Sequence, residues 1–517
     1  MRSYSTAYAF AALSPKPKAE SREPRAFLVL PSRPMLMSGE QPRAPWARVI
    51  GLVAGAACPI LTLTLESPWP ELAPVAWRTL GLAGLMAIWW VGEVIPIAAT
   101  GLLPLLAMPL MGIADLNAAA APYANPVIYL YLGGFMLGLA IERWSLHTRI
   151  ALGVMRRVGT RPDRLIGGMM LVTAFLSMWM SNTATAVMML PIGLSVIALV
   201  ESDTRSDFAR ALLLGIAYAA SIGGLATLIG TPPNALMAAY LSETYGLTIG
   251  FAPWMVVALP VSATLLVAAY FWLTRVAHRM PDEDADGLHA MIGQRLSALG
   301  RMQPAERIVA GVFAVTAIAW MIRPLLVSWT GLPISDTTIA LVAAMALFVL
   351  PADLATLAPV LDWDTAKRAP WGVLVLFGGG LSLAEQLQAS GLAEFIGGGL
   401  AATQTLPLFV VVGLTTTAIV VLTEVTSNTA TTASFLPILA PIGVAMGQGP
   451  LTLAVPVALA ASCAFMLPAA TPPNAIVFSS GHLRVSDMAR AGLALNVAGI
   501  VVITATAMLL ADVVFGG

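Results

Sequence analysis

The chain has 517 residues, of which 58% are apolar and only 10% are charged, and its formal net charge is zero. Soluble domains usually carry about 25% charged residues, so this composition excludes an ordinary soluble protein and predicts an all-α polytopic membrane protein. The balanced charge gives no reason to expect a nucleic-acid partner. Cys58 and Cys463 both lie in apolar runs, so we expect core residues rather than a disulfide or a metal site.

Residues 1–46 are polar and basic and are predicted to form a disordered cytoplasmic tail. Apolar segments of about 17–25 residues are candidates for membrane-spanning helices. In chain order they are 47–65, 78–95, 97–113, 127–142, 163–200, 209–241, 251–275, 307–323, 335–351, 370–388, 405–446, 452–479 and 487–513. The polar stretch 276–306 is predicted to be a cytoplasmic loop that connects two halves of the chain.

Two short polar motifs occur twice, once in each half, inside these apolar segments. The first motif is Ser181-Asn182-Thr183 and again Ser427-Asn428-Thr429. The second is Thr231-Pro232-Pro233-Asn234 and again Thr471-Pro472-Pro473-Asn474, which begin 50 and 44 residues after the respective serines. Interrupted hydrophobic segments at matching positions of two halves are the best sequence indication of a transporter binding site.

The distribution of basic residues predicts the topology, because Lys and Arg mark cytoplasmic loops. Loops 143–164 and 276–306 are basic, whereas 66–76, 242–250 and 446–451 carry no Lys or Arg. The loops alternate between the two sides if both Ser-Asn-Thr segments are re-entrant hairpins, which leaves about eleven transmembrane helices. The N-terminus is then cytoplasmic and the C-terminus periplasmic.

An odd number of crossings separates the two hairpins, so they enter from opposite faces and the halves form inverted repeats. The stretches YLGGFMLGLA at 131–140 and LFGGGLSLA at 376–384 also resemble each other, and each precedes its hairpin. Inverted repeats place a binding site near the middle of the membrane and permit alternating access.

The residue types of these motifs suit the binding of ions. Hydroxyl and amide oxygens can ligate a hard cation, while their hydrogens can donate to an anion. The Pro-Pro pairs unwind the helix at Gly230-Thr231 and at Ala470-Thr471, which exposes helix ends that attract ions. One such motif alone could equally be a bent helix whose hydroxyls bond to its own backbone. Because the motifs are duplicated, we favour a binding site.

Charged groups are sparse within the apolar segments. Glu93, Glu385 and Glu424 could include a proton carrier, but we favour helix-end or paired carboxylates. No Lys or Arg lies deep in a candidate span, so a bound anion would need helix dipoles, hydroxyls and co-bound cations for its neutralisation.

Four stretches resemble signatures of the divalent anion/sodium symporter family, namely SMWMSNTATAVMMLP, SIGGLATLIGTPPN, LTEVTSNTATTASFLP and SCAFMLPAATPPNAIVF. The resemblance covers nearly all of the chain after about residue 47. It implies a homodimer in membrane lipid, in which a transport part moves like an elevator against a scaffold. The implied arrangement is an extra N-terminal helix at 47–65, a first repeat at 78–275 (scaffold 78–142, transport elements 163–275), the connector 276–306, and a second repeat at 307–513 (scaffold 307–388, transport elements 405–513).

The resemblance also implies the ligands. One sodium ion would be held by Ser177, Ser181, Asn182 and the Gly230 carbonyl, and a second by Thr423, Thr426, Asn428 and the Ala470 carbonyl. The substrate would contact Ser181, Asn182, Thr183, Thr231, Pro232, Ser427, Asn428, Thr429, Thr471 and Pro472. Two hairpin sites imply at least two co-transported sodium ions.

The sequence therefore predicts a sodium-coupled carrier of C4-dicarboxylates such as succinate, fumarate or malate in a bacterial inner membrane, and not an enzyme. The alternatives within transport are a sodium-independent dicarboxylate exchanger and a carrier of sulfate or tricarboxylates. A cation/proton antiporter would need an essential buried carboxylate. An intramembrane enzyme would need a buried His or a pair of Asp residues, which the apolar segments do not contain.

Overall fold

The computed structural model describes residues 45–200, 206–280, 287–399 and 406–511. These residues are almost entirely helical, apart from a two-stranded antiparallel ribbon formed by β1 (Pro351–Asp353) and β2 (Ala358–Pro359). The predicted tail lies outside the described residues except at its last two positions, as does the extreme C-terminus. Both cysteines are free; Cys463 is buried as expected, whereas Cys58 is half-buried and not a core residue.

The N-terminal part begins with two packed helices, α1 (Pro45–Thr64) and α2 (Pro74–Gly92). The segment 97–113, predicted as one span, is not a continuous helix. The segment forms two short helices, α3 (Ile97–Thr100) and α4 (Leu103–Leu110). Gly101 separates them, and a Cβ there would lie 3.0 Å from Leu376 Cα, so the break allows close contact with another helix. A short helix α5 (Leu116–Ala120) and a 3-10 turn (Ala121–Ala124) follow.

The first half continues with seven helices in the described residues. They are α6 (Pro126–Arg143), α7 (Leu146–Val158), α8 (Pro162–Ser177), α9 (Asn182–Val200), α10 (Asp207–Leu225), α11 (Pro232–Tyr245) and α12 (Phe251–Phe271), the last extended by a π-helical turn (Trp272–Ala277). The basic stretch 143–164 thus contains a helix, α7. The connector 276–306 likewise contains α13 (Leu288–Leu299) and is not the simple polar loop that we expected.

The second half contains the remaining helices. They are α14 (Pro304–Met321), α15 (Arg323–Thr330), α16 (Asp336–Val349), α17 (Trp363–Ala366), α18 (Trp371–Ala389), α19 (Leu392–Gly399), α20 (Leu408–Thr423), α21 (Asn428–Ala445), α22 (Leu451–Ala461), α23 (Pro472–Phe478) and α24 (Val485–Thr506), with a π-helical turn at Ala507–Ala511. Arg323 at the start of α15 forms an ion pair of 3.4 Å with Asp336 at the start of α16.

Eight helical segments of the described residues are long and apolar enough to cross a membrane. Four shorter apolar segments are Ile97–Leu110, Asp336–Val349, Leu408–Thr423 and Leu451–Ala461. Leu408–Thr423 and Leu451–Ala461 belong to predicted spans that contain an interruption, whereas the other two do not. The total of about eleven crossings stays a prediction.

The helix breaks repeat between the halves, as the duplicated motifs predict. Helices α8 and α9 meet at a turn before Asn182, and α20 and α21 meet at a turn before Asn428. The following breaks differ in length, because they span 226–231 in the first half and 462–471 in the second. The second break begins earlier than the predicted interruption at Ala470-Thr471.

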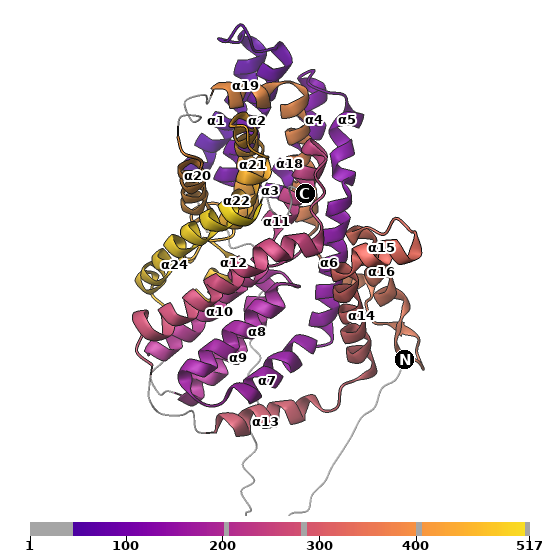
Figure 1. Ribbon diagram of the computed structural model, residues 1–517, viewed down its shortest axis with the longest axis vertical. Coiled ribbons are helices and arrows are strands. Elements are labelled where there is room, and N and C mark those ends of the chain that lie inside the picture. Colours follow the sequence, from indigo (N-terminus) through magenta and orange to yellow (C-terminus); the bar gives the residue numbers. More distant parts are fainter. Residues whose placement is uncertain (1–44, 201–205, 281–286, 400–405, 512–517) are drawn as a thin grey trace, which may run out of the picture. The chain divides into compact units, whose positions relative to one another are not determined.

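The two halves pack across each other around these breaks (Figure 1). Helix α11 of the first half packs against α21 and α22 of the second, while α23 of the second half packs against α9 and α10 of the first. Helix α10 is nearly all buried and is rich in Ala, Gly and Leu, which lets its neighbours approach closely. This reciprocal packing connects the hairpin of each half with the broken helix of the other.

Candidate functional site

Three oxygen atoms converge on the side chain of Asn182 at the start of α9. With its NH₂ group directed toward them, the amide lies 2.7 Å from Ser177 Oγ, 3.1 Å from the Ala220 carbonyl and 3.3 Å from the Gly230 carbonyl. This orientation is assigned because the two carbonyls can only accept hydrogen bonds. Ser177 Oγ, in turn, donates to the Ala220 carbonyl at 2.5 Å. The group is rich in oxygen atoms with free lone pairs, and oxygen atoms are the ligands that a hard cation prefers.

Two glycines make this convergence possible. A Cβ on Gly224 would lie 2.5 Å from the terminal amide of Asn182, and a Cβ on Gly230 would lie 2.4 Å from the Gly224 carbonyl oxygen. A larger residue at Gly224 would force the broken helix away from the hairpin, and one at Gly230 would force the two sides of the break apart. The structure therefore brings together Ser177, Asn182 and Gly230, as the family resemblance implies.

Asn234 of the Thr-Pro-Pro-Asn motif holds the broken backbone of the first half. Its Nδ2 donates to the carbonyls of Gly224 (3.2 Å), Leu225 (3.1 Å) and Thr227 (2.8 Å). The Thr227 hydroxyl also donates to the Met178 carbonyl in the hairpin turn. Carbonyls that a helix break would leave unpaired are thus satisfied within the protein, as a buried break requires.

The second hairpin repeats the arrangement around Asn428. Thr423 Oγ1 lies 2.7 Å from Asn428 Oδ1 and 2.7 Å from the Ala461 carbonyl. A hydroxyl has one hydrogen to donate and here it faces two acceptors, so this cluster also has more acceptor oxygens than donors. Thr426, by contrast, has its hydroxyl bonded to the Leu422 carbonyl and lies 2.6 Å from Thr431 Oγ1.

Glu424 fixes the longer break of the second half. This residue is 6% exposed and accepts from the backbone N–H groups of Phe465 (2.8 Å), Met466 (2.9 Å) and Leu467 (3.1 Å), and from Asn496 Nδ2 (2.7 Å). These four donors satisfy the buried carboxylate within the protein. The bonds also explain why the break starts early, since these N–H groups no longer serve a helix. Glu424 is therefore a bonded structural carboxylate, as we expected.

Asn474 performs for the second break the same task as Asn234 does for the first. Its Nδ2 donates to the carbonyls of Ala464 (3.1 Å) and Leu467 (3.0 Å), and its backbone N–H bonds to Thr471 Oγ1 (3.4 Å). Glu93, another of the three carboxylates named above, follows α2 in a left-handed conformation with φ of 43°. It is thus a helix-end residue.

Each Ser-Asn-Thr motif forms the N-terminus of a long helix. Asn182 begins α9 and Asn428 begins α21, while Ser181 Oγ accepts from the Ala184 N–H at 3.2 Å. Helix N-termini attract anions through their free N–H groups and the helix dipole. Ser181, Asn182 and Thr183 are half-buried, as are Ser427 and Asn428, and Thr429 is buried. Each motif can therefore present oxygens to a cation and N–H groups to an anion.

The two breaks meet at a contact between Thr231 and Ser462, whose hydroxyl oxygens lie 3.3 Å apart. Thr231 and Thr471 are both buried, Pro232 is half-buried and Pro472 is exposed. None of the ion pairs within the described residues involves a residue of the four motifs. The polar character of this region comes from amides, hydroxyls and backbone groups.

The sequence did not reveal several of these participants. The Ala220 and Ala461 carbonyls carry no side-chain signal, so only the fold identifies them. Ser462 and Asn496 are polar residues within apolar segments, which was a usable signal.

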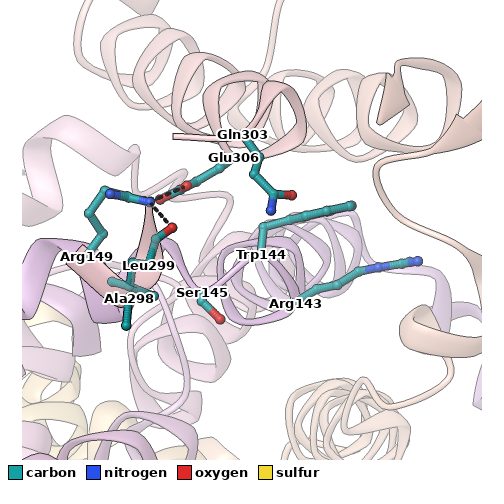
Figure 2. Close-up of a pocket in the computed structure, with 8 residues that line it drawn as sticks. All are labelled: Arg143, Trp144, Ser145, Arg149, Ala298, Leu299, Gln303 and Glu306. Atoms are coloured by element: carbon teal, nitrogen blue, oxygen red, sulfur yellow. Dashed lines mark hydrogen bonds and ion pairs between the residues drawn. The ribbon is translucent and has the colours of Figure 1, made fainter. Parts of the chain in front are cut away.

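A separate cavity of about 300 Å³ lies where α6 ends and α7 begins (Figure 2). Arg149 forms two bonds to Glu306, at 2.5 and 3.0 Å, and donates to the carbonyls of Leu299 and Gly300. Arg143 pairs with Asp362 at 2.7 Å. The guanidinium groups of Arg143 and Arg149 are thus neutralised by carboxylates of the chain. We therefore interpret this cavity as a packing contact between α7 and the connector and not as the candidate site.

Comparison with known proteins identifies the family of this chain. The family model described as the sodium:sulfate symporter transmembrane region matches residues 46–516. The chain belongs to the sodium:sulfate symporter family. The resemblance predicted from the four motifs is thereby confirmed.

Relatives within the sodium:sulfate symporter family match over most of their length. The chain is 41% identical over 480 residues to the sodium-dependent dicarboxylate transporter SdcS of Staphylococcus saprophyticus, which covers 91% of this chain and 92% of the relative. It is 40% identical over 483 residues to the protein of the same name from Staphylococcus aureus USA300, with the same coverage.

Two solved structures share the fold. The YdaH transporter of Alcanivorax borkumensis has a TM-score of 0.53 at 14% identity, and covers 91% of this chain and 97% of its own. MtrF of Neisseria gonorrhoeae has a TM-score of 0.55 at 13% identity, with 90% and 94% covered. The identities are low, so these two structures inform the fold alone.

Proposed function

We propose that this protein is a sodium-coupled secondary transporter of C4-dicarboxylates such as succinate, fumarate and malate. The observation that carries the proposal is the repeated cluster of oxygens around Asn182 and Asn428, each at the N-terminus of a long helix. Two cation clusters beside two anion-attracting helix ends match a substrate with two carboxylates. The 41% and 40% identical relatives are named sodium-dependent dicarboxylate transporters, which supports the same substrate class.

Two sodium ions are proposed to travel with the substrate. Ser177, Ser181, Asn182 and the Gly230 carbonyl would bind one, and Thr423, Asn428 and the Ala470 carbonyl the other. Thr426 would bind the second ion through its backbone carbonyl oxygen. Its hydroxyl could take part only if the hydrogen bond to the Leu422 carbonyl breaks. A dianion buried without a compensating charge would be prohibitively unstable, so the co-bound cations supply the neutralisation.

The substrate carboxylates are proposed to bind at the two Ser-Asn-Thr tips. Ser181, Asn182 and Thr183 would receive one carboxylate, and Ser427, Asn428 and Thr429 the other. Thr231, Pro232, Thr471 and Pro472 would line the same pocket, in keeping with the contact between Thr231 and Ser462.

The movement is proposed to follow the division that the sequence indicates. Helices α8 to α12 and α20 to α24 would form the transport part, and α2 to α6 with α14 to α18 the scaffold. We place the N-terminus in the cytoplasm and the C-terminus in the periplasm of a bacterial inner membrane, and we expect a homodimer. The packing of α6 with α14 and α16, and of α10 with α8 and α12, supports this division.

The decisive experiment is radiolabelled succinate uptake into proteoliposomes under an imposed sodium gradient, with sulfate and citrate as competitors. Uptake that requires sodium and resists sulfate would support the proposal. Succinate counterflow that is equal in sodium and in choline would identify a sodium-independent exchanger. Strong competition by sulfate or citrate would instead identify a carrier of those anions.

Site variants make the test specific. Thr423→Ala should weaken the dependence of uptake on sodium, because it removes a hydroxyl from the second cluster. Thr417→Ala is the matched control, because Thr417 lies in the same helix and donates only to its own helix, at the Gly413 carbonyl. Equal loss of uptake in both variants would contradict the assignment of Thr423.

A further inference from the structure

The turn of the first hairpin contains a buried aromatic residue, Trp179, between the proposed cation ligands Ser177 and Ser181. Trp179 is 8% exposed, and its indole N–H has no hydrogen-bond partner. A buried donor without a partner is costly. Any stabilising contribution of Trp179 must therefore come from the contacts of its ring and not from its N–H group.

The ring of Trp179 stacks on residues from two other helices. Its centroid lies 6.3 Å from that of Trp320 on α14, with planes 7° apart, and 6.0 Å from Phe251 at the start of α12. Phe313 on α14 meets it edge-on at 5.0 Å. Such aromatic pairs contribute stability beyond that of area burial alone.

The partner rings are themselves fixed. Phe251 and Trp320 stack at 4.3 Å. Asp336 at the start of α16 holds both residues, because its Oδ2 accepts from the Phe251 N–H at 2.8 Å and its carbonyl accepts from Trp320 Nε1 at 3.0 Å. Trp179 thus rests on a preformed surface.

The backbone of the same turn also packs on α6. A Cβ placed on Gly138 would lie 3.3 Å from the Trp179 carbonyl oxygen and 3.6 Å from Met180 Cα. The turn of the first hairpin is therefore held from one side by α6 and from another by α14. Both helices belong to the proposed scaffold.

The second hairpin lacks this support. Val425 stands two residues before Ser427, as Trp179 stands two residues before Ser181, and Val425 is 63% exposed. The turn of the second hairpin is instead fixed through Glu424, which bonds to backbone of its own half. The two proposed cation clusters thus depend on different parts of the protein.

We infer that Trp179 is a positioning residue for the first sodium site, and that contact of this turn with α6 and α14 sets the sodium affinity of that site. The second site keeps its geometry regardless of this contact. By linkage, sodium at the first site must then stabilise the contact by the same factor as the contact strengthens sodium binding. The inference rests on the proposed function, because it assigns unequal roles to the two proposed sodium sites.

Three variants test the inference in proteoliposomes and by thermal stability in sodium. Trp179→Val installs the residue that the second hairpin has, and should raise the sodium concentration for half-maximal uptake about tenfold. Trp179→Phe keeps a ring and removes the unpaired N–H, so it should stay within about twofold of wild type. Val425→Ala is the matched control in the second hairpin and should leave the sodium dependence unchanged. Equal sodium dependence of Trp179→Val and wild type, with normal folding, would overturn the inference.

A disulfide distinguishes positioning from a general packing defect. Gly138→Cys with Met180→Cys, in a background where Cys58 and Cys463 are replaced by Ala, would fasten the turn to α6. Adding Trp179→Val to this protein should weaken sodium-dependent thermal stabilisation when the disulfide is reduced, and oxidation should restore it. Persistent weakness after oxidation would contradict the positioning role. A wild-type protein that does not respond to sodium at all would instead refute the proposed function.

Discussion

Thr231 Oγ1 lies 3.3 Å from Ser462 Oγ, and this contact joins the helix break of the first half to that of the second. Both residues are buried, and each stands at the edge of a broken helix. The contact therefore links two sites that the sequence places 231 residues apart. Through this contact, a ligand that binds at one helix break can affect the geometry of the other break.

Ser462→Ala should reduce this influence without removing a proposed ligand. We expect a loss of unfolding free energy of about 1 kcal/mol, typical of one hydrogen bond. A double-mutant cycle with Thr231→Val, read by thermal unfolding, should show a coupling of about 0.5–1.5 kcal/mol. Strictly additive effects would mean that the two hydroxyls do not interact.

Asn182→Asp should make folding depend on sodium. A carboxylate in place of the amide would face Ser177 Oγ and the Ala220 and Gly230 carbonyls, which are mainly acceptors. We expect a lower melting temperature without sodium and a larger rise on adding sodium than in wild type. Succinate uptake should fall strongly, because a negative charge beside a dianion costs several kcal/mol before relaxation.

Two comparisons complete this test. Asn428→Asp should behave like Asn182→Asp, since the second cluster repeats the first. Asn117→Asp is the control, because Asn117 is exposed on α5. Wild-type succinate affinity in either motif variant would refute the site.

Glu424→Gln should destabilise the protein rather than change its coupling to protons. The amide would accept less strongly from the three backbone N–H groups and would set its own NH₂ group against one of its four donors. We expect a loss of about 2–4 kcal/mol in unfolding free energy. The exposed Glu394→Gln is the control. A folded Glu424→Gln protein that loses only proton-dependent transport would revive the antiporter alternative.

Stability should fall in mild acid through His278. Its Nδ1 lies 3.3 Å from Asp207 Oδ1, Nε2 is buried without a partner, and burial lowers the pKa of the imidazole below its ordinary value of 6.5. Because the folded state binds the proton less readily than the unfolded state, this residue contributes fully above about pH 6.5. The contribution is lost as the pH falls toward the lowered pKa. His278→Gln should reduce the change in melting temperature between about pH 7 and pH 5. An identical pH dependence of the melting temperature in wild type and variant would contradict the assignment.

The sequence predicted the repeated features well because each is a local interruption of an apolar segment. The Ser-Asn-Thr and Pro-Pro motifs lie where helices α9, α11, α21 and α23 begin, as the sequence predicts. A Pro-Pro pair removes two backbone donors and therefore favours a helix start at that point. The break of 97–113 into α3 and α4 was missed, because it depends on Gly101 meeting Leu376 from a distant segment. The early start of the second break was missed for the same reason, since Glu424 captures N–H groups some forty residues away.

The side chains of the site could be predicted from the sequence, but the backbone groups that they contact could not. Ser177 and Asn182 lie five residues apart on one turn, so their proximity follows from the sequence. The carbonyls of Ala220 and Ala461 enter the clusters only through helix packing. The unequal support of the two turns, by Trp179 and by Glu424, also needed the fold, although both residues differ visibly between the repeats.

Sodium should stabilise this protein before the substrate binds. The polar groups of the two oxygen clusters at Ser177 and Thr423 lie 2.5–3.3 Å from one another and come from the hairpin and from a neighbouring helix. A cation that binds either cluster would therefore add further bonds between these segments. A ligand that binds only the folded state stabilises it by mass action, by about 2.7 kcal/mol at a hundredfold excess over its Kd. We therefore expect the melting temperature to rise in sodium alone and to change little in potassium at equal ionic strength.

Succinate alone should stabilise weakly, and sodium with succinate should stabilise most, because the two ligands must raise each other's affinity equally. Ser181→Ala and Thr423→Ala should each reduce the sodium response, while Thr417→Ala should not. The measurement is thermal unfolding of the purified protein across a matrix of sodium and succinate concentrations. Equal succinate affinity in sodium and in choline would end the coupled interpretation, and an exchanger would then account for the same fold and motifs.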